Sequence, residues 1–110
     1  MKHRLKRLVW TIEDHIKDSG YDIKNARLEK EEEKEEMFNF YLMSAKQRME
    51  MADDCISKMD TILNEYEREE RVKGKSQEII EEKIEAWECL KNIFEHKIKT
   101  RTKEIQEMKM

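Results

Sequence analysis

Apolar residues recur with helical spacing through the middle of this chain. Between Phe38 and Tyr66 they are separated alternately by four and three residues, which is the pattern of a helix packed lengthwise along another helix. Flanking apolar residues widen this face on one side, and so wide a face usually contacts more than one helix. The seam positions are Phe38, Leu42, Ala45, Met49, Ala52, Ile56, Met59, Leu63 and Tyr66, and the flanking positions are Tyr41, Cys55 and Ile62.

Glycines indicate where the helices end. A first, short amphipathic helix is expected over residues 2–18, closed by Gly20, because glycine readily adopts the left-handed conformation at a helix C-terminus. No further breaker occurs before Gly74, so a long second helix is expected over residues 22–72. Its charged part, residues 29–36, has six Glu and two Lys and no apolar residue, which is typical of a solvated helical segment.

A third helix is expected over residues 77–108, with Ser76 as its N-cap. Because its connection to the second helix is short, the two helices must be antiparallel neighbours, with facing residues whose numbers sum to about 150. The sequence therefore predicts an all-α fold, a single domain over residues 1–110, built as a long, coiled-coil-like antiparallel hairpin with a short N-terminal helix. The third helix's apolar positions are Ile80, Ile84, Trp87, Leu90, Phe94, Ile98, Ile105 and Met108.

The position of the first helix has two interpretations. It could fold back along the acidic part of the second helix, which would bring Arg7 near Glu33 and Arg4 near Glu36. Alternatively, a break near Glu36 would let it dock on the wide apolar face, giving a three-helix bundle. The pattern does not choose between them.

A helix pair alone buries one stripe and is poorly stabilised, so the chain is expected to form a homodimer with a four-helix-type core. In this architecture, although in no sequence motif, the chain resembles the small plasmid-encoded RNA-binding hairpins.

Composition supports a cytoplasmic helical protein. Charged residues make up 45% of the chain and apolar residues 37%, with no Pro and two Gly, which favours long helices over a large globular core. Cys55 and Cys89 lack the framework of a small secreted domain and are interpreted as reduced thiols. No run approaches the length of a membrane span, so no membrane partner is expected.

Catalytic and metal-binding patterns are absent from the sequence. No His follows a Glu at the three-residue spacing of helical di-iron sites, and no Cys-x-x-Cys occurs. Cys89 and His96 could share a helix face, but two ligands make a poor metal site. Helical rods also lack the concave pocket that nucleophilic catalysis needs. No enzyme activity, metal or cofactor is expected.

One short run, from Met59 to Tyr66, reads Met-Asp-Thr-Ile-Leu-Asn-Glu-Tyr. It resembles the second-helix signature of the small aspartyl-phosphate phosphatases that act on sporulation response regulators, which are also helical hairpins. The carboxylate that precedes the Asp60 position in that family is replaced here by Lys58, and the family's upstream turn is missing. The phosphatase activity is therefore not carried over.

Exposed apolar residues point to protein–protein interaction as the function. Met-rich and aromatic surfaces adapt well to partner helices. The chain is therefore interpreted as a non-enzymatic adaptor, regulator or inhibitor that presents helical faces to another protein. The candidate residues, which all lie off the predicted seams, are Trp10, Met37, Phe40, Met43 and Met51.

Nucleic-acid binding is the alternative. The net charge of -3 argues against a general nucleic-acid coat, but two segments are locally basic. In the folded-back arrangement they would meet near the middle of the rod and could contact the backbone of an RNA or a duplex. The basic residues are Lys2, Arg4, Lys6, Arg7, Lys97, Lys99, Arg101 and Lys103.

Overall fold

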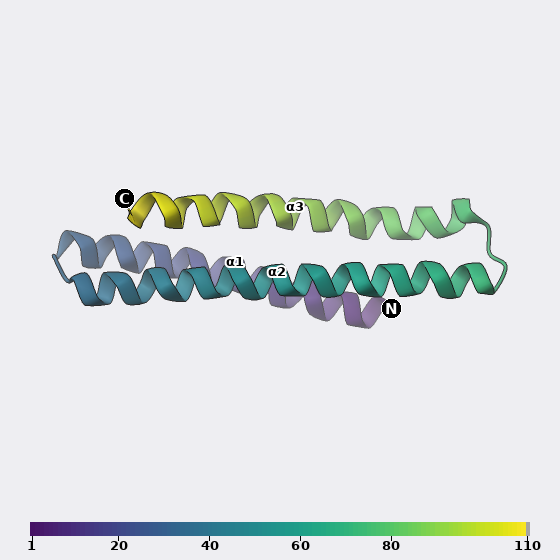
Figure 1. The fold of residues 1–110 in the computed structure, drawn as a ribbon, viewed down its shortest axis with the longest axis horizontal. Coiled ribbons are helices and arrows are strands. Elements are labelled where there is room, and N and C mark those ends of the chain that lie inside the picture. Colours follow the sequence, from purple (N-terminus) through teal and green to yellow (C-terminus); the bar gives the residue numbers. More distant parts are fainter. Residues whose placement is uncertain (110) are drawn as a thin grey trace.

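The structure, a computed structural model, describes residues 1–109. This part of the chain is all-helical and contains three long helices, α1 (Lys2–Glu31), α2 (Glu35–Val72) and α3 (Gln77–Lys109). They form a rod of 63 × 19 × 15 Å. As Figure 1 shows, α1 and α3 run in the same direction and α2 runs antiparallel to both.

The first predicted boundary is wrong. The helix predicted over residues 2–18 continues through Gly20 and ends only at Glu31. The buried stripe explains this, because it carries on past the glycine with Ile23 and Ala26. Burial of these side chains outweighs the roughly 1 kcal/mol that a glycine costs inside a helix.

The helix predicted over residues 22–72 is also wrong, because the chain turns inside the charged part at 29–36. Glu33 adopts a positive φ of 60° and connects α1 to α2. A helix through this segment would place glutamates four residues apart, which is unfavourable. The third helix is confirmed, since Gly74 has a φ of 82° in the turn and Ser76 Oγ accepts a hydrogen bond from the Ile79 amide.

The first helix docks on the wide apolar face of α2 rather than along the acidic segment. Arg4 lies 3.5 Å from Glu65, so the predicted approaches of Arg7 to Glu33 and of Arg4 to Glu36 are wrong. Cys55 and Ile62 are buried. The break lies slightly earlier than the predicted one near Glu36, and the result is the predicted three-helix alternative.

The helix seam of α2 is confirmed as the centre of the core. Ala45 and Ala52 are fully buried, and Phe38 and Tyr66 at the two ends are half-buried. Between α2 and α3, Lys91 Nζ lies 2.7 Å from Asp60 Oδ1, which agrees with facing numbers that sum to about 150. Since α1 covers this core within one chain, the apolar stripe needs no second copy to cover it.

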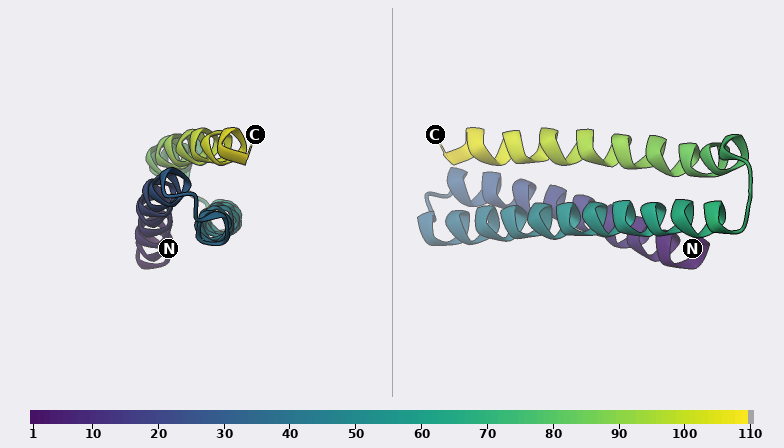
Figure 2. Two further views of the ribbon diagram at one scale, coloured as in Figure 1. Left: turned by 90° about the vertical axis from the view of Figure 1, so that its left-hand side faces the viewer. Right: turned by 45° about the vertical axis from the view of Figure 1, so that its right-hand side comes forward.

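The three helices are not parallel along their whole length. Figure 2 shows α1 crossing α2 at an angle, so that its C-terminal half lies beside α3 while its N-terminal end diverges from α3. Partly buried residues of α3, such as Ile84 and Trp87, lie in the half of α3 from which α1 diverges. No helix among residues 1–109 is both long and apolar enough to cross a lipid bilayer.

Candidate interaction surfaces

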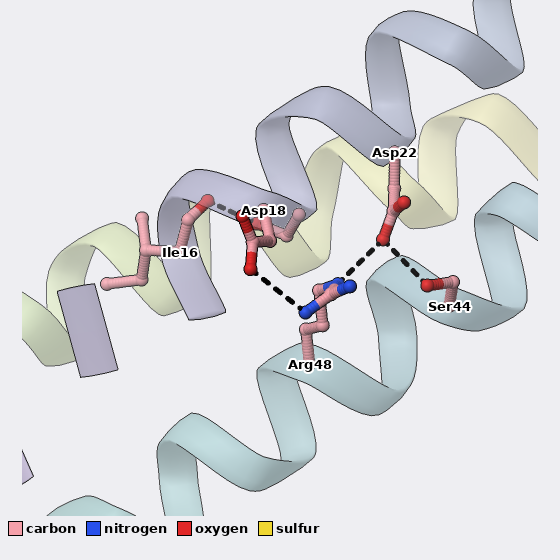
Figure 3. Close-up of polar contacts among 6 residues, drawn as sticks. Ile16, Asp18, Asp22, Ser44 and Arg48 are labelled. Atoms are coloured by element: carbon pink, nitrogen blue, oxygen red, sulfur yellow. Dashed lines mark hydrogen bonds and ion pairs between the residues drawn. The ribbon is translucent and has the colours of Figure 1, made fainter. Parts of the chain in front are cut away.

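A polar cluster fixes α1 against α2 near the middle of the rod. The guanidinium of Arg48 on α2 bridges two carboxylates of α1, with Nε 3.0 Å from Asp22 Oδ2 and Nη1 3.2 Å from Asp18 Oδ2 (Figure 3). Ser44 Oγ donates a second hydrogen bond of 2.8 Å to the same Asp22 oxygen. One turn earlier, Ser19 Oγ donates to the Ile16 carbonyl oxygen at 2.6 Å. This cluster sets the register of the two helices.

Four of the five predicted partner-binding residues lie together. Met37, Phe40, Met43 and Met51 are all exposed and fall within about a third of the circumference of α2, which follows from the 100° that each residue turns in a helix. We call them the Met–Phe face. The Phe40 ring also packs edge-on against the ring of Tyr41, at 5.5 Å between centroids.

Trp10, the fifth residue, lies on α1 and not on the Met–Phe face. Its indole is 63% exposed and lines a shallow hollow with the basic side chains of the N-terminus. A second hollow lies beside it in the groove between α1 and α2, where cations surround an apolar floor. Its lining residues are Arg4, Arg7, Leu8, Lys58, Thr61 and Ile62.

The two predicted basic segments do not form one patch. Arg4 lies opposite Glu65 of α2, whereas Arg101 of α3 lies against Gly20 of α1. Sixteen residues of α1 separate these levels, roughly 24 Å at 1.5 Å per residue. Lys97, Lys99 and Lys103 are exposed, as are Lys2 and Lys6 at the other segment.

Arg101 points into the helix interface rather than toward solvent. A Cβ atom added to Gly20 would lie only 3.2 Å from Arg101 Nη2. The guanidinium Nε is buried without a hydrogen-bond partner in the described part of the chain, and Nη1 reaches Glu104 at 3.5 Å. Arg101 is thus a structural contact of α3 with α1, which removes it from the candidate nucleic-acid patch.

Two groups that could carry chemistry, Asp60 and Cys55, are held in structural roles. Asp60, the residue singled out by the phosphatase resemblance, accepts a hydrogen bond from Lys91 at 2.7 Å. Burial raises the pKa of the Cys55 thiol, which keeps this group protonated and poorly nucleophilic at neutral pH. Both cysteines are free, with Cys89 exposed. Among residues 1–109 no group of three or more His, Cys, Asp or Glu could hold a metal ion.

Sequence reasoning missed the outward face of α1. Tyr21 and Leu28 are large and exposed, but they lie beyond residue 18, where the first helix was expected to end. Their spacing from Trp10, eleven and eighteen residues, is the signal that could have found them, because both numbers return to the same helix face.

Comparisons with protein-family models, with curated proteins and with solved structures give no match for this chain.

Proposed function

We propose that this protein is a non-enzymatic interaction module of the cytoplasm, an adaptor, regulator or inhibitor that binds another protein through the Met–Phe face. The observation that carries the proposal is the exposure of Met37, Phe40, Met43 and Met51 on one side of α2, from 41% for Met37 to 62% for Met43. Leaving large apolar side chains in water is unfavourable, and burial by a partner removes that cost.

The kind of partner follows from the side chains. Three methionines and one phenylalanine make a flexible, polarisable surface without a fixed charge of its own. Such surfaces fit the apolar stripe of another helix, with anchors spaced at three, four and seven residues. We also propose that the chain forms a homodimer, through a different surface.

The test compares two variants as baits in nuclease-treated lysate. In the first, the four residues of the Met–Phe face become Gln, which has a similar helix propensity to Met. In the second, three exposed apolar residues elsewhere become Gln, namely Val72, Ile79 and Ile93. We expect one protein to be retained in stoichiometric amount by the wild type and by the second variant, and lost by the first. Equal retention by both variants, or no retention by the wild type, would contradict the proposal.

Nucleic-acid binding is a second candidate, favoured by the hollows at the N-terminus of α1, where Arg4, Lys6 and Arg7 surround the exposed Trp10. Cations contact phosphates, and an exposed indole can stack on a base. With about four cations engaged, the logarithm of affinity would fall by roughly three to four per tenfold rise in salt. Titration of a fluorescent RNA and a duplex at several salt concentrations tests this, and no binding at low salt would exclude it.

A further inference from the structure

The outward face of α1 carries a second helix-packing pattern, independent of the core. Its positions are separated alternately by three and four residues from Arg7 to Glu31, and all eight are exposed. They include Trp10, Tyr21 and Leu28, which are 63%, 56% and 50% exposed. We call this set the outer stripe. Its members are Arg7, Trp10, Asp14, Lys17, Tyr21, Lys24, Leu28 and Glu31.

The charged side chains of the outer stripe form no ion pair with the other residues that the structure describes. Arg4, Asp18 and Arg27, just off the stripe, each lie in an ion pair with α2 or α3. Over residues 1–109, by contrast, no ion pair involves any of the five charged residues on the stripe itself. The stripe therefore presents both unburied apolar groups and unpaired charges.

The outer stripe is complementary to itself when two copies run antiparallel. If facing residues have numbers that sum to 38, each pair is favourable. Arg7 faces Glu31, Trp10 faces Leu28, Asp14 faces Lys24 and Lys17 faces Tyr21. Every pair occurs twice across the two-fold axis, so the seam would hold four ion pairs, two apolar contacts and two cation–aromatic contacts.

Other arrangements of the same stripe bring like charges together. Sliding one copy by a heptad in one direction makes the facing numbers sum to 31 and sets Arg7 against Lys24. Sliding it the other way makes them sum to 45 and sets Asp14 against Glu31. A parallel pairing sets each charged residue against its own copy. The charge pattern thus favours one register and one orientation, as it does in antiparallel coiled coils.

We propose that the chain dimerises through the outer stripe of α1, with two α1 helices antiparallel and the two-fold axis at the level of residue 19. This deepens the self-association included in the proposed function and differs from the four-helix core expected from the sequence, because the two cores stay separate. It is independent of the Met–Phe face on α2. A wild-type protein that stays monomeric but still captures its partner would therefore refute this inference and leave the proposal for the Met–Phe face intact.

The first test reverses single charges and then restores complementarity. Asp14→Lys sets lysine against Lys24, and Lys24→Asp sets aspartate against Asp14, so each should weaken the dimer about tenfold or more in sedimentation equilibrium. The double variant Asp14→Lys, Lys24→Asp recreates the two opposite-charge pairs between positions 14 and 24, whereas a parallel pairing would still set like charges against each other at both positions. We expect it to bring the dissociation constant back to within about threefold of the wild type.

Controls separate the interface from general charge effects and from misfolding. Lys103→Asp makes the same charge change as Lys24→Asp, on an exposed position of α3, and should leave the dimer unchanged. Circular dichroism should show equal helix content in all variants, since both stripe positions are exposed. A monomer at every concentration tested would overturn the proposal, and so would a dimer that neither single charge reversal weakens.

The second test measures the relative direction of the two α1 helices in the dimer. In a Cys89→Ser background, protein with Asp14→Cys is mixed with protein with Lys24→Cys and oxidised mildly. The antiparallel register predicts that the disulfide between positions 14 and 24 of different chains predominates in peptide mass spectra. Predominance of disulfides that join position 14 to 14, or 24 to 24, would overturn it.

Discussion

Gly20 of α1 lies directly under the guanidinium of Arg101 from α3, so close that a Cβ atom on the glycine would be 3.2 Å from Nη2. The glycine was expected to end a helix, yet it lies inside one and provides space for a side chain of another. Here the absence of a side chain has a packing role and not a conformational one.

This contact predicts that Gly20→Leu changes the stability of the protein in opposite directions in two backgrounds. Gly20→Leu should gain about 1 kcal/mol of helix propensity but force Arg101 out of its position, at a cost of roughly 1–3 kcal/mol. We therefore expect net destabilisation in the wild type. In an Arg101→Ala background the obstruction is gone, and the same substitution should stabilise the protein. Urea melts of the four proteins give this double-mutant cycle, and additive effects would show that the two residues are not coupled.

Ala52 tests the packing of the seam. It is fully buried, so Ala52→Leu should overpack the core and cost roughly 1–3 kcal/mol, although helix propensity hardly changes. Ala86 is the matched control, since it is exposed on α3 and Ala86→Leu should be nearly neutral. Thermal melts followed by circular dichroism compare the two. A midpoint for Ala52→Leu equal to or above that of the control would mean that the wrong face of α2 has been placed inside.

The Arg48 cluster should contribute more to stability than an exposed ion pair. Asp22 is only 9% exposed, so Arg48→Met leaves this carboxylate with Ser44 as its remaining partner and should cost about 2 kcal/mol. Arg27→Met is the control, because its pair with Glu104 is 3.9 Å long and its side chain largely exposed, and it should cost about 0.5 kcal/mol or less. Chemical denaturation measures both, and equal losses would contradict the structural role of the cluster.

Lys91 gives α2 and α3 a contact whose contribution to stability is lost at alkaline pH. Its hydrogen bonds to Asp60 and Glu88 raise the pKa of the ammonium group well above its ordinary value. A raised lysine pKa adds stability that is fully present below the unfolded-state pKa of about 10.4 and is lost as pH rises toward the folded-state pKa. Lys91→Met should therefore cost about 1 kcal/mol at pH 7, and progressively less above pH 10. A difference between wild type and variant that stays constant up to pH 12 would rule this out.

The two thiols should differ in reactivity. Cys89 is exposed, whereas Cys55 is buried and burial raises its thiol pKa. Iodoacetamide at pH 8 should therefore alkylate Cys89 first, with Cys55 reacting only as the protein opens. Mass spectrometry of the timed reaction checks the order, and simultaneous modification would place Cys55 at the surface.

The core could be predicted from the sequence where one periodic pattern dominated. The seam from Leu42 to Leu63 and the helix after Ser76 are where the spacing indicated, because burial of an unbroken apolar stripe outweighs every local preference. The same reasoning failed at Gly20, where a local stop signal was given priority although Ile23 and Ala26 continue the stripe.

The turn at Glu33 could not be found from breakers, because no Gly or Pro marks it. The turn forms because docking of α1 on α2 gains more free energy than is lost by ending a helix among a few mutually repelling glutamates. The four residues of the Met–Phe face were predicted to be exposed, together with Trp10, since none of the five had a place in a seam. The outer stripe was not predicted, because a helix that ends at residue 18 is too short to show it.

Because α1 crosses α2 at an angle, the two ends of the rod should differ in local stability. The N-terminus of α1 lies near Glu65 of α2. From Glu67 through the Gly74 turn to about Glu85, α2 and α3 therefore pack against each other without a third helix. Backbone amides there are expected to exchange with deuterium well before those near Arg48, where three helices meet. We therefore expect local opening to begin at the Gly74 end, while the end that carries the Met–Phe face keeps its shape.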